Sequence, residues 1–141
     1  MKNSKSIYIL LITIIMPSFL QATEINLYSH DRFIHELRDG TKLVTGRIRC
    51  PEGYTAIHVW INSREDKGHY FIQGNKNRQH EVKVRLEGDD WHPSTRANNR
   101  GIEKSNSSNQ AIFYVVVDGK QQPVSDEYTF SISSSCLDKN L

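Results

Sequence analysis

The clearest alternation of hydrophobic and polar positions lies near the C-terminus, from Val124 to Cys136. Apolar side chains at Tyr128, Phe130 and Ile132 alternate there with polar ones, and Cys136 has the same parity. A period of two is typical of a β-strand with one buried face. The pattern therefore predicts a strand whose inward face carries three large apolar side chains and a thiol.

A second alternating segment runs from Lys42 to Cys50 and also ends in an inward cysteine, in line with Val44 and Ile48. A long polar loop is predicted from Gly88 to Asn109, and Asp31–Leu37 fits either a helical turn or irregular chain. The same period predicts further strands over Glu24–Ser29, Thr55–Ile61, His69–Gln73, Glu81–Glu87 and Ala111–Val117.

Short strands separated by turn signals are typical of an all-β, immunoglobulin-like sandwich. In that topology the strands that end in Cys50 and Cys136 run in the same direction on opposite sheets, so their ends lie close together. We therefore predict a Cys50–Cys136 disulfide, with Trp60 packed beside it. After Cys136 only Leu137–Leu141 remain, so we expect the sandwich to lack its last (G) strand.

The N-terminal segment has a different pattern. Lysines at positions 2 and 5 precede an apolar run from Ile7 to Met16, which is followed by Pro17 and by Leu20-Gln21-Ala22. This is the order of a secretory signal peptide, and the run is too short to span a bilayer. We predict that residues 1–22 are removed and that residues 23–141 form one domain. Export favours a disulfide between the two cysteines.

Removal of the leader changes the charge. The full chain has 18 basic and 16 acidic residues, and the loss of Lys2 and Lys5 leaves equal numbers. Nothing in this balance indicates a nucleic-acid partner.

The composition also disfavours an enzyme. Two cysteines and six scattered histidines make no zinc-ligand spacing, so no cofactor or metal is expected. Asp89-Asp90 with His92 is more typical of a solvated turn than of a catalytic cluster.

The order and spacing of short segments along nearly the whole mature chain give a family resemblance. The chain resembles the AfaD-type invasins, which are minor subunits of chaperone–usher adhesive fibres, and departs most from them between Gly101 and Gln110. The segments are Leu37-Arg38-Asp39-Gly40, Thr45-Gly46-Arg47-Ile48 with Cys50, His58-Val59-Trp60 with Asn62, His80 to Arg85, Gly88-Asp89 with Trp91 and Pro93, Asp118-Gly119, and Glu127-Tyr128 with Phe130-Ser131 and Cys136.

The resemblance implies an immunoglobulin-like sandwich completed by donor-strand complementation, a form of β-augmentation. The implied partners are a periplasmic chaperone, an outer-membrane usher and a major fimbrial subunit that supplies the donor strand. We expect the groove for this strand to be lined by Ile25 and Leu27 together with Tyr128, Phe130 and Ile132. Because the first strand begins just after the cleavage site, the mature chain is expected to accept a strand without donating one. It would then cap a fibre at the cell surface.

The resemblance also implies attachment to and entry into host cells, with an integrin as one candidate receptor. The chain contains no Arg-Gly-Asp, and Arg38-Asp39-Gly40 is better interpreted as a β-turn. Outward cations on two strands of one sheet, Arg47, Arg49, Lys83 and Arg85, are candidates for a receptor-facing basic patch. An ordinary solvated face is the competing interpretation.

Two other functions remain open from the sequence. One is a freestanding secreted β-sandwich that binds a ligand without belonging to a fibre. The other, more distant, is a secreted all-β enzyme.

Overall fold

The computed structural model describes residues 10–15, 24–29, 36–95, 100–105 and 110–138, with the backbone alone for the first two segments. Every regular element in these segments is a β-strand. None of the described residues forms a helix long and apolar enough to cross a membrane. The strands are β1 (Leu10–Ile15), β2 (Glu24–Ser29), β3 (Lys42–Arg49), β4 (Ala56–Ile61), β5 (Arg64–Asp66), β6 (His69–Gln73), β7 (Glu81–Glu87), β8 (His92–Pro93), β9 (Ile102–Ser105), β10 (Gln110–Val117) and β11 (Tyr128–Leu137).

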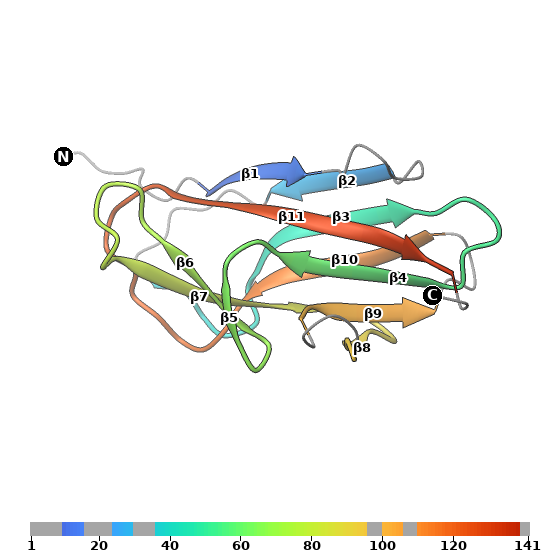
Figure 1. The fold of residues 1–141 in the computed structure, drawn as a ribbon. Coiled ribbons are helices and arrows are strands. Elements are labelled where there is room, and N and C mark those ends of the chain that lie inside the picture. Colours follow the sequence, from blue (N-terminus) through green and yellow to red (C-terminus); the bar gives the residue numbers. More distant parts are fainter. Residues whose placement is uncertain (1–9, 16–23, 30–35, 96–99, 106–109, 139–141) are drawn as a thin grey trace.

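The strands form two sheets packed face to face (Figure 1). One sheet has the order β1-β11-β4-β9-β8, and the other has the order β2-β3-β10-β7-β6-β5. All pairings are antiparallel except that between β1 and β11, which is parallel. Figure 1 shows β3 and β11 pointing in the same direction on opposite sheets, as predicted.

The period-two segments form strands at the predicted places, within a residue or two at their ends, except that β11 begins at Tyr128 and not at Val124. The predicted loop from Gly88 to Asn109 was wrong in part, because it contains β8 and β9, which extend the five-stranded sheet beyond β4. Its polar residues follow no alternation, so local sequence carries no sign of this pairing. The polar segment after β4 also forms the short strand β5. Of the ambiguous segment from Asp31, residues 31–35 lie outside the described residues.

The core lies between the sheets and is formed by the inward side chains that the alternation predicted. Val44 and Ile48 of β3, Phe113 of β10 and Ile132 of β11 are fully buried. Fully burying such a side chain contributes about 1.5–3 kcal/mol. Because these side chains come from strands far apart in the sequence, the core forms only when those strands pack together.

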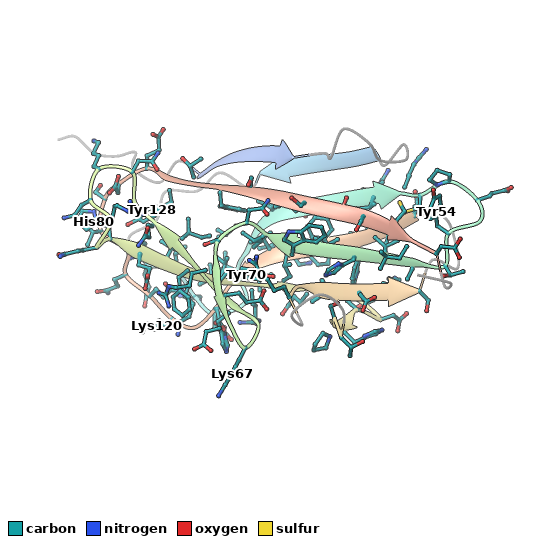
Figure 2. All side chains as sticks on the ribbon, in the orientation of Figure 1. Tyr54, Lys67, Tyr70, His80, Lys120 and Tyr128 are labelled. Carbon is teal, nitrogen blue, oxygen red and sulfur yellow. A yellow bond between two sulfur atoms is a disulfide. The ribbon has the colours of Figure 1, made fainter. Side chains whose placement is uncertain are left out.

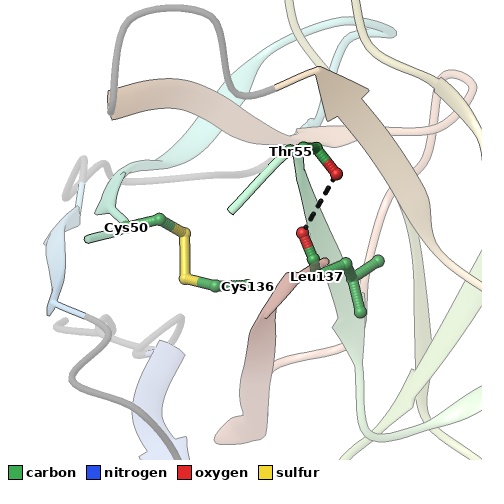
Figure 3. Close-up of a disulfide and its surroundings, with 4 residues drawn as sticks. All are labelled: Cys50, Thr55, Cys136 and Leu137. Atoms are coloured by element: carbon green, nitrogen blue, oxygen red, sulfur yellow. Dashed lines mark hydrogen bonds between the residues drawn. A yellow bond between two sulfur atoms is a disulfide. The ribbon is translucent and has the colours of Figure 1, made fainter. Parts of the chain in front are cut away.

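The predicted disulfide between Cys50 and Cys136 is present and is buried at one end of the core (Figure 3). It joins the residue after β3 to the penultimate residue of β11 and so links the two sheets. Beside it, both the amide and the hydroxyl of Thr55 donate to the carbonyl of Leu137, at 2.8 and 3.4 Å. The C-terminal end of β11 is therefore held both to the end of β3 in the opposite sheet and to the residue before β4 in its own sheet.

The expectation that Trp60 packs beside the disulfide was wrong. The inward residues of β4 are Ile57, Val59 and Ile61, so Trp60 points to the outer face of the sheet. There its ring lies 4.7 Å from that of His58, and its indole N–H donates to Asn62 Oδ1 at 3.1 Å. The parity of the strand decides the direction of the side chain, whatever its hydrophobicity.

Replacing both cysteines by serine is expected to lower the free energy of unfolding by about 2–5 kcal/mol, because the bridge closes a loop with a sequence separation of 86 residues. Chemical denaturation of the oxidised protein and of the double serine variant measures this difference. Equal midpoints for the two proteins, or free thiols in the unreduced protein, would contradict the role assigned to the bridge.

Candidate functional site

The candidate site is the hydrogen-bonding edge of β11 that faces away from β4. One edge of β11 pairs antiparallel with β4, from Ile132 opposite Ile61 to Leu137 opposite Ala56. The other edge pairs in parallel with β1, and the two strands run side by side in Figure 1. β11 is therefore an internal strand only because β1 lies beside it.

The register of β1 covers the first half of β11. Leu10 lies opposite Tyr128, and the pairing continues without a shift to Ile15 opposite Ser133. β1 falls inside the segment predicted to be a removable leader. The sheet thus takes its outermost strand from a part of the chain that does not belong to the predicted domain.

The inward face of β11 is buried along this pairing. With β1 in place, the exposed fractions are 3% for Tyr128, 4% for Phe130 and 0% for Ile132. Burial and the nearby charge of Asp126 raise the pKa of Tyr128 to about 12, and its hydroxyl donates to the carbonyl of Val124 at 2.5 Å. Tyr128 is therefore a neutral core residue whose one polar atom is satisfied locally.

The start of β11 is held by Asp126, whose side chain is completely buried. Its carboxylate accepts hydrogen bonds from the backbone N–H groups of Lys76, Asn77 and Glu127, at 3.0, 3.1 and 2.6 Å. The Nδ1 atom of His80 lies 2.8 Å from the same carboxylate. These bonds tie the β6–β7 loop to the residues just before β11, at the end of the molecule where Figure 2 labels His80 and Tyr128.

Gly74 makes this arrangement possible. A Cβ atom at position 74 would collide with the carboxylate of Asp126 and would come within 3.0 Å of His80 Cβ. Gly74 also forms an isolated bridge with Tyr128, and the amide of Asn75 donates to the carbonyl of Glu127 at 2.8 Å. The six-stranded sheet is therefore joined to the beginning of β11 by backbone as well as by Asp126.

The hydrogen bonds outweigh burial in setting the pKa of Asp126. Burial alone would raise this pKa, but the N–H donors and His80 hold it well below its ordinary value of 3.8. Sequence analysis did not select Asp126 or His80. The signal available was an aspartate two residues before a strand, a position where Asp often caps turns.

The outer face of β11 is polar and is also anchored. The side-chain amide of Asn62 donates to the hydroxyls of Ser131 and Ser133, at 3.1 and 2.7 Å. Ser133 is itself buried. The position of β11 is thus set from β4, from the β6–β7 loop and from the disulfide, none of which involves β1.

The structure brings together only part of the predicted groove. Tyr128, Phe130 and Ile132 share the buried face of β11, as expected. The side chains of Ile25 and Leu27 lie outside the described part of the structure, although the backbone of β2 is paired with β3 at the edge of the other sheet. The full groove lining therefore stays a prediction.

The four cations of the predicted basic patch lie on strands that flank β10, as expected, but at different places along it. Arg47 is opposite Ile112, whereas Arg85 is opposite Val116. Four residues of an antiparallel strand span about 14 Å. The arginines of β3 and the cations of β7 are therefore two separate pairs. Tyr114 of β10 lies between the two pairs, and the Lys42 ammonium lies 3.9 Å from the centroid of its ring.

Arg85 is also neutralised by its neighbours. Its guanidinium contacts the carboxylates of Asp39, Glu87 and Asp118 at 2.7–3.1 Å. Asp39 lies in the β-turn of Arg38-Asp39-Gly40, which is closed by a hydrogen bond from Thr41 N to Arg38 O, so the turn interpretation is confirmed. By contrast, Arg49 is exposed and Arg47 is half-buried, with its Nε buried and unpartnered among the described residues.

In the part of the chain that the structure describes, no three His, Cys, Asp or Glu side chains gather as metal ligands. The Asp89-Asp90 pair forms part of a turn that precedes His92, and Asp90 has a φ of 65°. The arrangement at β11 instead offers backbone donors and acceptors beside a buried apolar face. Such an edge binds another strand.

This all-β sandwich of two sheets is the immunoglobulin-like fold of chaperone–usher fimbrial subunits. The minor tip subunit HdaB of the Escherichia coli Hda pilus superposes with a TM-score of 0.78 and 32% identity, over 84% of this chain and 86% of HdaB. Protein AggB of Escherichia coli is 41% identical over 128 residues, which are 89% of this chain and 88% of AggB. Protein AfaD of the same species is 36% identical over 130 residues, which are 90% and 88% of the two chains.

The model of the Enterobacteria AfaD invasin protein family matches residues 33–134. The chain therefore belongs to this family, as the resemblance in its sequence indicated.

Replacing Asp126 by Asn is expected to lower the melting temperature at neutral pH, because a neutral amide holds the N–H groups of the β6–β7 loop less strongly. The folded carboxyl has a lowered pKa, so its contribution is complete above about pH 4 and is lost as the pH falls toward the folded pKa. Between pH 7 and pH 2 the melting temperature should thus fall more steeply for the natural protein than for Asp126→Asn. Asp66→Asn, at an exposed position, is the matched control, and parallel pH curves for natural protein and Asp126→Asn would contradict the assignment.

Proposed function

We propose that residues 23–141 form the tip subunit of a chaperone–usher fimbria, which is exported through the periplasm and displayed at the cell surface, where it mediates attachment to and entry into host cells. The observation that supports this most directly is the pairing of β11 with β1. The edge of β11 accepts a strand, and the strand it holds comes from the predicted leader.

Removal of residues 1–22 would take β1 away and leave the outer row of N–H and C=O groups of β11 unpaired. An unpaired edge beside an apolar face is prone to aggregation, so it has to be covered. On our proposal a periplasmic chaperone covers it first, and a donor strand from the major fimbrial subunit replaces the chaperone during assembly at the usher. The anchors of β11 described above would keep the edge in place during this exchange.

The tip position and the absence of enzymatic activity are parts of the same proposal. HdaB, with 32% identity, is a minor tip subunit of its pilus. The family is that of the AfaD invasin protein, and AggB is the minor subunit of aggregative adherence fimbriae type I, so the role that we propose is binding. A host-cell receptor, with an integrin as the candidate, is the remaining proposed partner.

A freestanding secreted sandwich is the second candidate, since its edge could be covered by self-association. Expression with the chaperone from the same bacterium separates the two functions. Co-purification of a one-to-one complex supports the fibre subunit. A stable mature monomer that ignores the chaperone supports the freestanding protein.

Fusing an alternating apolar segment of a major subunit to the C-terminus, through a short flexible linker after Leu141, is expected to stabilise the mature chain. The added strand would pair with β11 and bury several side chains, each contributing about 1.5–3 kcal/mol before ordering costs. We expect the melting temperature of residues 23–141 to rise by about 10 °C or more on fusion, and swapped oligomers to become monomers.

The control for this experiment carries the same fused segment with its inward apolar residues replaced by serine. This control should behave like the unfused chain. An unfused chain that is already a stable monomer, with the same melting temperature as the fusion, would remove the physical basis of the proposal.

The receptor surface is proposed to include the outward cations of the six-stranded sheet, and their separation gives a sharper test. Reversing Arg47 and Arg49 to Glu should lower the melting temperature less than the other pair, because Arg49 is exposed and the half-buried Arg47 has no ion pair among the described residues. Reversing Lys83 and Arg85 should destabilise the fold by about 1–3 kcal/mol, because Arg85 holds three carboxylates.

Binding to cultured host cells at low and physiological salt is the readout for both pairs. We expect Arg47→Glu with Arg49→Glu to reduce attachment most strongly at low salt, where surface charges are least screened. Unchanged attachment of this folded double variant at both salt concentrations would leave the cations as an ordinary solvated face.

A further inference from the structure

A cleft of about 610 Å³ opens on the side of the sandwich that carries β8, away from β1. One wall comes from the β5–β6 turn and the end of β7, and the other comes from β8 and the start of β9. We propose that this cleft is a binding site for a neutral saccharide. The inference deepens the attachment function proposed above and rests on it for the biological setting.

An aromatic ring in a fixed position forms one wall. The indole N–H of Trp91 donates to the carbonyl of Ile112 at 2.8 Å, and its ring meets Phe113 edge-on at 6.2 Å between centroids. Gly88 leaves room for it, since a Cβ atom there would come within 2.6 Å of Trp91 Cδ1. The half-exposed Trp91 ring lines the cleft, and an indole ring suits the apolar C–H face of a pyranose.

The charges around the cleft favour a neutral ligand. The lining contains two carboxylates, Glu65 and Glu87, and two cations, Lys67 and Arg85, so its formal charge is balanced. Glu87 is paired with Arg85 at 3.1 Å, and Glu65 with Arg100 at 3.4 Å. A charged ligand would have to compete with these ion pairs. The hydroxyl groups of a neutral ligand can instead donate hydrogen bonds to the remaining lone pairs of the carboxylates and accept them from the remaining N–H groups of the cations.

The floor of the cleft is formed by core residues. Tyr70 and Leu86 are buried there, and Figure 2 labels Lys67 at the outer tip of the β5–β6 turn. The hydroxyl of Tyr70 is buried next to the carboxylate of Glu65, which also lines the cleft. Its burial, and then the nearby Glu65 carboxylate, raise the pKa of Tyr70 above its usual range, so it stays a protonated donor.

A second cleft, of about 650 Å³ between β6 and β11, provides the contrast. Its polar side chains are bound to one another, with Asn75 donating to Thr129 at 2.9 Å and Arg78 to Gln73 at 3.3 Å. It presents no tryptophan ring. Arg78 therefore offers a matched control position that should not affect saccharide binding.

Saturation-transfer NMR on the folded, disulfide-bonded protein tests the proposal, with lactose and methyl mannoside as neutral probes and sialyllactose as the charged counterpart. We expect transfer to the ring C–H protons of a neutral probe, and a shift of the Trp91 indole N–H signal on titration. Trp91→Ala should weaken this binding by about tenfold or more. Because Trp91 contacts the core, His92→Ala, at an exposed lining position, provides a second variant that keeps the fold and should also weaken binding.

Arg78→Ala should bind the neutral probe like the natural protein. The proposal is overturned if no neutral probe gives transfer at millimolar concentration, if binding survives both Trp91→Ala and His92→Ala, or if only sialyllactose binds. Stabilisation by the fused donor strand is measured separately. A chain that gains this stability without binding saccharide loses the present inference alone, and one that binds saccharide without the gain loses the fibre proposal alone.

Discussion

The fold depends on the pairing of β11, a strand that runs along the core from one end to the other. Its inward side chains fill the space between the sheets, so the strand cannot leave without opening the core. Its backbone pairs on one side with β4 and on the other with β1, which lies in the predicted leader. On our proposal this second edge is filled from outside the domain, and the other features respond to that constraint.

Two different anchors hold this strand at its ends. At the C-terminal end the disulfide joins β11 to β3 in the opposite sheet. At the N-terminal end the buried carboxylate of Asp126 gathers N–H groups from the β6–β7 loop, and Gly74 provides the space for it. One anchor is the covalent disulfide, and the other is a set of charge-assisted hydrogen bonds. Together they fix the position of β11. On our proposal they do so whichever strand pairs with its outer edge.

The proposed assembly and attachment functions lie on different surfaces of the molecule. The side of β11 is used for assembly in our proposal, while the side of β8 carries a cleft with a fixed tryptophan and balanced charges. The outer face of the six-stranded sheet is a third surface. Arg85 and its three carboxylates join the turn at Asp39 to β7 and to the residue after β10, which makes it a structural group more than a free charge. Assembly and attachment can therefore use different parts of one small domain.

The alternation of residues by itself determined most of the strands and the buried face of β11, because both follow from local parity. The cysteine pair followed from that parity together with the sandwich topology expected for the strands. The same parity, applied strictly to β4, would also have placed Trp60 on the outer face. Only the tertiary structure decided what lies beside each strand. It placed the predicted leader segment on β11, brought β8 and β9 to β4, and separated Arg47 from Arg85 along β10. These outcomes come from pairings and registers between distant segments, and a local period contains no information about which partner fills a free edge.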